Sequence, residues 1–110
     1  MKILICGLGS IGKRHAANLL FLKKKNLIFF RERNLSLNEN KLKNITTFNS
    51  LKKSLNQNPD VAFICNTTSK HMDTAIECAK KGCHLFIEKP LSNNLKKIKI
   101  LESIIKKKKI

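Results

Sequence analysis

The chain has 110 residues, enough for one domain and not for two, so we expect a single domain over residues 1–110. Hydrophobic residues make up 42%, which allows a packed core, and no apolar run approaches the roughly 20 residues of a membrane span. The formal net charge is +16, but no aromatic platforms lie among the lysines, so the charge does not favour a nucleic-acid partner.

Short apolar runs alternate with amphipathic segments in the first half of the chain. The run that follows Met1 has no signal-peptide layout, so we expect a cytoplasmic protein. The four residues 23–26 should end the first helix, with Asn26 as the stop. The predicted elements are a strand at 2–6, a helix at 11–22, a strand at 27–30, a loop with or without a short helix at 31–44, a strand at 45–48, and a helix capped by Asn49 or Ser50 that ends near Leu55.

The second half of the chain repeats the alternation after a turn signal at 58–60. Gly82 is a suitable residue to end the helix that precedes it. The predicted elements are a strand at 61–65, a helix at 70–81, a strand at 84–87, and a last helix that begins at Ser92 or Asn93.

Strands that alternate with helices predict a doubly wound parallel α/β sheet, because parallel strands need crossover connections. We expect the strand order 3-2-1-4-5. Ligands of such sheets lie at the carboxyl ends of the strands, where the strand order reverses. Gly7, Asn66 and Glu88 directly follow the first, fourth and fifth strands, so we expect all three at one crevice.

A glycine motif, G-x-G-x-x-G, lies between the first strand and the first helix. Gly7 permits the tight turn, Gly9 lets a pyrophosphate approach the backbone, and Gly12 lets the helix pack close to the strand. The N–H groups of the helix start, at Ser10 and Ile11, attract phosphate together with the helix dipole. The motif therefore predicts a dinucleotide site.

The residues after the second strand leave the choice of dinucleotide open. A carboxylate there binds the ribose diol of NAD, whereas an arginine suits the 2′-phosphate of NADP. Arg31, Glu32 and Arg33 are adjacent, so one residue of register decides between NAD and NADP.

The four cysteines do not predict a metal or redox site. No pair forms C-x-x-C, and the predicted elements bury them. We expect Cys6, Cys65, Cys78 and Cys83 to pack as small apolar side chains.

Three stretches resemble the N-terminal half of the Gfo/Idh/MocA oxidoreductases. They are residues 7–12 with His15, residues 60–71, and residues 82–91 with Glu88-Lys89-Pro90 after a strand. The resemblance implies hydride transfer between a nicotinamide cofactor and the hydroxyl or ketone of a sugar or cyclitol.

The resemblance also implies roles for single residues. Lys89 would polarise the substrate oxygen, Glu88 would contact the cofactor, and Pro90, often after a cis bond in the family, would fix the direction of the lysine. His71 would face the crevice, although a packing role for it stays open. Asn66 and Thr67 would lie at the nicotinamide, where the family usually has Thr-Pro.

The length departs from the family, which has a second α/β domain that completes the substrate site. We interpret the chain as a shortened or split member that is inactive alone and would need a separate C-terminal substrate domain. An exposed sheet edge would favour a homo-oligomer. A non-catalytic NAD(P)-binding module and a basic nucleic-acid-binding protein are the alternatives.

Overall fold

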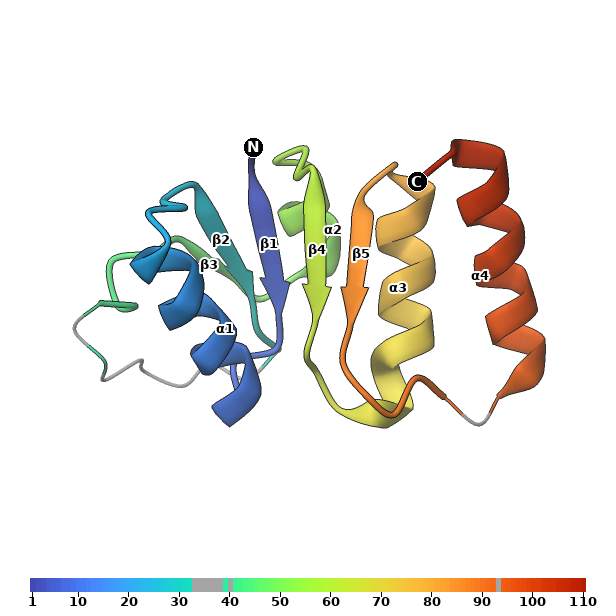
Figure 1. Cartoon of the computed structure of the whole chain (residues 1–110), viewed down its shortest axis with the longest axis horizontal. Coiled ribbons are helices and arrows are strands. Elements are labelled where there is room, and N and C mark those ends of the chain that lie inside the picture. The colour runs from blue at the N-terminus through green and yellow to red at the C-terminus, as the bar shows by residue number, and fades with distance from the viewer. Residues whose placement is uncertain (33–38, 40, 93) are drawn as a thin grey trace.

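The computed structural model describes residues 1–32, 39, 41–92 and 94–110. A five-stranded sheet with helices on both faces makes up this part of the chain (Figure 1). The elements in chain order are β1 (Ile3–Cys6), α1 (Ser10–Phe21), β2 (Leu27–Phe30), β3 (Thr47–Phe48), α2 (Leu51–Leu55), β4 (Val61–Ile64), the 3₁₀ turn η1 (Thr68–Lys70), α3 (His71–Lys80), β5 (His84–Ile87) and α4 (Leu95–Lys108).

The strand order is β3-β2-β1-β4-β5 and every pair is parallel, which confirms the predicted fold class and strand order. In the central register, Ile5 of β1 lies opposite Phe29 on one side and Phe63 on the other. All carboxyl ends therefore meet at one edge of the sheet, where the loops after β1, β4 and β5 gather (Figure 1).

The core has two layers because successive side chains of a strand point to opposite faces. On one face, Ile3 and Ile5 pack with Ala16 of α1. On the other face, Leu4 and Cys6 pack with side chains of α2, α3 and α4. All four residues of β1 are buried, as a strand covered on both faces should be.

The face of β5 on the α1 side is left open. Phe86 is 46% exposed there and stacks on Phe63 of β4, with 4.8 Å between the ring centroids. Helix α4 packs on α3, on the opposite face of the sheet (Figure 1). The predicted exposed edge is thus an edge strand with one aromatic face in solvent.

Helix α1 begins and ends within one residue of its predicted range, but Lys23 and not Asn26 is the residue that stops it. Lys23 adopts φ 62°, and the N–H groups of Lys23 and Lys24 donate to the carbonyls of Leu20 and Leu19. This is a Schellman motif, and a lysine takes the left-handed position in place of glycine. Strand β3 starts two residues later than predicted, because the Ile45 N–H is used in a turn.

The other boundaries follow local capping. Ser50 caps α2 through the Lys53 N–H, and Gly82 takes φ +86° directly after the helix α3 and its cap, as predicted. Helix α4 begins later than predicted, because the side chain of Asn94 accepts from the Lys97 N–H. The alternative start at Asn93 and half of the predicted loop at 31–44 lie outside the described residues.

Candidate functional site

A cavity of about 470 Å³ lies at the carboxyl edge, between the ends of β1, β2 and β4. This is the point where the strand order reverses, and the volume lies within the range of small-molecule sites. We call it the central cavity. Among the described residues, those that line it are Gly7, Leu8, Gly9, Ser10, Ile11, Phe30, Arg31, Glu32, Cys65, Asn66, Thr67 and Lys70.

The three glycines of the motif meet different surroundings. Gly7 has φ +92°, and a Cβ built on it would lie 2.6 Å from the Cα of Asn66. A Cβ on Gly12 would lie 2.0 Å from the Gly7 carbonyl oxygen, because α1 touches the loop that follows β1. A Cβ on Gly9 would meet no described atom within 4 Å, because it would project into open space. The geometry agrees with the turn, packing and approach roles predicted from the spacing.

The N-terminus of α1 faces the central cavity. Gly9 is the N-cap, and Ser10 and Ile11 are the first helical residues. The first N–H groups of a helix have no intrahelical acceptor, and the positive end of the helix dipole adds to their attraction for an anion. The first turn of α1 contains no acidic side chain that would compete for them.

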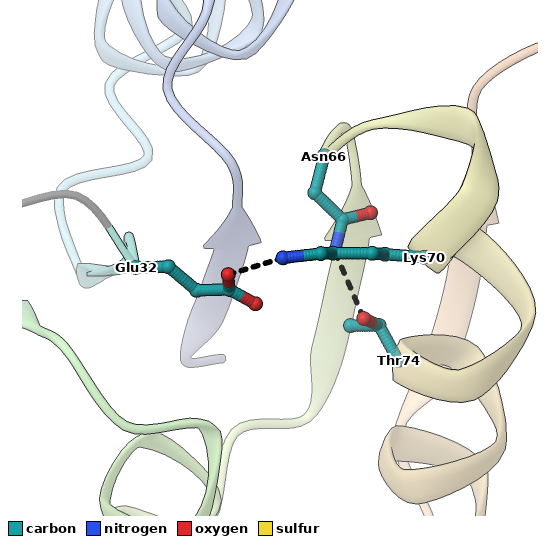
Figure 2. Close-up of polar contacts among 4 residues, drawn as sticks. All are labelled: Glu32, Asn66, Lys70 and Thr74. Atoms are coloured by element: carbon teal, nitrogen blue, oxygen red, sulfur yellow. Dashed lines mark hydrogen bonds and ion pairs between the residues drawn. The ribbon is translucent and has the colours of Figure 1, made fainter.

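Polar side chains from the loops after β2 and β4 also line the cavity. Glu32, two residues after β2, forms an ion pair with Lys70, the last residue of η1 (Figure 2). The Asn66 side chain donates to the Thr74 hydroxyl at 2.8 Å (Figure 2). The buried Oδ1 of Asn66 has no hydrogen-bond partner among the described residues.

Glu88, directly after β5, contacts α1, and residues 88–90 lie outside the lining of the central cavity. The carboxylate of Glu88 is 2.6 Å from Nε2 of His15, whose ring also contacts Phe63 and Phe86. The hydrogen bond from His15 is the largest cause that lowers the pKa of Glu88, and Lys89 adds to the effect. The predicted contact between Glu88 and a cofactor therefore has to form while the Glu88 carboxylate is hydrogen-bonded to His15.

His71 is a buried link between two loops. It is 2% exposed, with Nε2 2.7 Å from the Asn66 carbonyl oxygen and Nδ1 3.2 Å from that of Pro90. The Lys89–Pro90 peptide bond is cis, as the resemblance implied. His71 does not line the central cavity, so the geometry corresponds to the packing role that the sequence left open.

The structure brings eight of the predicted site residues into the lining of the central cavity. They are Gly7, Gly9, Ser10, Ile11, Arg31, Glu32, Asn66 and Thr67. Five others, Gly12, His71, Glu88, Lys89 and Pro90, lie outside the lining. The roles given to these residues stay predictions.

Four lining residues were missed by the sequence analysis: Leu8, Phe30, Cys65 and Lys70. Three of them had a usable signal, because Leu8 lies inside the glycine motif and Phe30 and Cys65 end or follow a strand. Lys70 had none beyond its place at the start of a predicted helix. Burial, with a smaller effect of Glu88, raises the pKa of Cys65 to about 12, so its thiol is a neutral part of the wall.

Two other kinds of site are absent from the described ranges. No three His, Cys, Asp or Glu side chains there are grouped so that they could hold a metal ion. No helix of these ranges has the length and apolar character that crossing a membrane requires.

Comparisons with known proteins agree with this geometry. A family model described as "Oxidoreductase family, NAD-binding Rossmann fold" matches residues 1–110. The chain is 32% identical to a myo-inositol 2-dehydrogenase of Thermotoga maritima over 103 residues, which cover 86% of this chain and 30% of that enzyme.

Solved structures show the same partial coverage. A probable dehydrogenase from Thermotoga maritima superposes with a TM-score of 0.87 at 30% identity, over 100% of this chain and 34% of that one. The WlbA dehydrogenase of Chromobacterium violaceum, solved with NADH and UDP-GlcNAcA, gives 0.86 at 21% identity, over 99% and 33%, and supports the fold alone. The chain thus spans about a third of the length of these relatives.

Proposed function

The chain belongs to the Gfo/Idh/MocA oxidoreductase family with its NAD-binding Rossmann fold, and on that premise we propose that it is the cofactor half of a sugar or cyclitol dehydrogenase. In this proposal the central cavity binds the dinucleotide, and hydride passes between the nicotinamide and a carbon that carries a hydroxyl or keto group. When bound, the nicotinamide supplies the hydride acceptor or donor.

The observation that carries the proposal is the open space in front of Gly9. The space adjoins the N-terminus of α1, where N–H groups without intrahelical acceptors can donate to a pyrophosphate. Gly7 and Gly12 are both in close contact with backbone, which brings the end of β1, the loop after β4 and the start of α1 together beside that space. The residues present therefore fit a dinucleotide.

The two ends of the cavity differ in chemistry. Glu32 can accept hydrogen bonds from ribose hydroxyls at the end of β2, with Arg31 beside it. Asn66 and Thr67 would lie toward the nicotinamide. Beyond them, Lys89 would orient the substrate oxygen and Glu88, held by His15, would contact the cofactor.

We propose further that the substrate groups come from outside these 110 residues. The support is the coverage of about a third of the related dehydrogenases. The domain would act in the cytoplasm, where free thiols such as its four buried cysteines stay reduced. It would work with a separate substrate domain. The NAD(P)-binding domain itself would be either a single copy or a homo-oligomer.

Calorimetry of the 110-residue chain with NAD and with NADP tests the binding part. We expect binding by the wild type and none by Gly9→Val, because the valine side chain would fill the space of the pyrophosphate. The variant should stay folded with a small loss of stability from a poorer N-cap, since no described atom lies within 4 Å of the new Cβ. Absence of heat with both cofactors at millimolar concentration would refute the proposal.

An activity assay tests the catalytic part. The chain alone should not reduce NAD or NADP with myo-inositol or simple sugars. Steady turnover by the purified chain that Lys89→Ala abolishes would contradict the need for a separate substrate domain.

A further inference from the structure

Glu32 and Lys70 reach across the central cavity from opposite walls. Glu32 follows β2 and Lys70 ends η1, which lies after β4, so β1 runs between the two elements (Figure 2). Both side chains line the cavity, and each is about half exposed, at 53% and 51%. Of the ion pairs between described residues, the Glu32–Lys70 pair is the one in which both partners line the central cavity.

The backbone that carries Lys70 is well fixed. The Lys70 N–H donates to the Thr67 carbonyl at 2.9 Å. The next residue, His71, is buried, with its ring nitrogens against the Asn66 and Pro90 carbonyls. The backbone at Lys70 is thus held by hydrogen bonds at Lys70 and at His71, and the Lys70 side chain extends from there to Glu32.

NAD and NADP differ only in the 2′-phosphate of the adenosine ribose. A carboxylate at this position accepts from the ribose hydroxyls of NAD and repels the phosphate of NADP. Here the carboxylate of Glu32 is already paired with an ammonium, and the Arg31 side chain adds a second positive charge to the lining.

We propose that Lys70 is a specificity-determining residue of the cofactor site, and that its ammonium offsets the charge of Glu32 so that the domain accepts NADP as well as NAD. The inference rests on the proposed binding of a dinucleotide in the central cavity. With NAD bound, Glu32 turns to the ribose hydroxyls. With NADP bound, Lys70 leaves Glu32 for the phosphate, which a lysine binds well as a compact charge.

The test is calorimetric titration of the 110-residue chain with NAD and with NADP at low salt. Lys70→Met removes the ammonium and keeps an aliphatic side chain of similar length. Lys80→Met is the matched control, because Lys80 is also about half exposed and paired with a glutamate, Glu77, but lies at the far end of α3 and outside the lining. Glu32→Gln removes the carboxylate charge.

We expect Lys70→Met to weaken NADP binding about tenfold, equivalent to about 1.4 kcal/mol, and to change NAD binding less than threefold. Lys80→Met should change neither, and Glu32→Gln should shift the preference toward NADP. Equal losses for both cofactors in Lys70→Met, or no change relative to Lys80→Met, would overturn the inference.

Two further results separate this inference from the proposed function. A wild-type chain that binds NAD but not NADP would overturn the role of Lys70 and leave the proposed function standing. A wild-type chain that binds neither would overturn both. Thermal melts of all variants show whether each is folded, and the exposure of the replaced side chains makes folding the expected result.

Discussion

Gly12→Ala should destabilise the domain far more than Gly9→Ala, although each adds one methyl group to the same glycine motif at the start of α1. The new Cβ at Gly12 would lie 2.0 Å from the Gly7 carbonyl oxygen, and that atom belongs to backbone. A carbon and a carbonyl oxygen in contact normally stay about 3.3 Å apart, so the start of α1 would have to move by about 1.3 Å. A shift of this size should cost about 3 kcal/mol of stability, the upper end of the range for substitutions that overpack a core.

A loss of about 3 kcal/mol corresponds to a melting temperature roughly 12–24 °C lower for a domain of this size. Gly9→Ala meets no described atom within 4 Å and changes only the N-cap preference, which costs about 0.5 kcal/mol. Thermal unfolding followed by circular dichroism compares the two. Melting temperatures of the two variants within a few degrees of each other would refute the packing argument.

Three other outcomes are expected. In His15→Phe, the pKa of Glu88 should rise toward the ordinary 4.5 in an NMR titration, because the hydrogen bond that lowers it is gone, and an unchanged pKa would exclude His15 as the cause. Since the folded-state pKa of Glu88 is lowered, its ionised carboxylate stabilises the wild-type fold, and that stabilisation should be lost as the pH falls below 4.5. Cys65, with its pKa at about 12, should be roughly 10⁻⁴ ionised at pH 8 and resist a thiol reagent until the chain is unfolded; rapid labelling of the folded chain would contradict its burial. The open face at Phe63 and Phe86 should drive reversible association as salt screens the +16 charge, and light scattering that gives a monomer at low and high salt would count against it.

The sheet was predictable because its strands are nearly pure apolar runs. β2 and β5 match their predicted ranges, because Asn26 and Arg31 bound the apolar run of β2, and Gly82 and Glu88 lie close to the ends of β5. The strand order followed from the alternation with helices and from the glycine motif. Both signals are local, so a single sequence contains them.

The side-chain partners at the site were not predictable in the same way. Glu88 was assigned to the cofactor, but its carboxylate meets His15, which is 73 residues earlier. Lys70 looked like one of many surface lysines until the fold placed it opposite Glu32. Such pairs depend on where two elements lie in space, and the sequence around one partner does not indicate the other.

The contacts of His71 have a consequence for the two loops that it joins. A neutral imidazole carries one N–H, whereas both of its neighbours are carbonyl oxygens, which only accept. The shorter distance, 2.7 Å, is to the Asn66 carbonyl, so the better hydrogen bond is the one donated by the tautomer with its N–H at Nε2. In that tautomer the loop after β4 is tethered to α3, while the carbonyl of Pro90 faces a lone pair. The loop that carries Lys89 can then move without breaking a hydrogen bond to His71, and the asparagine loop cannot.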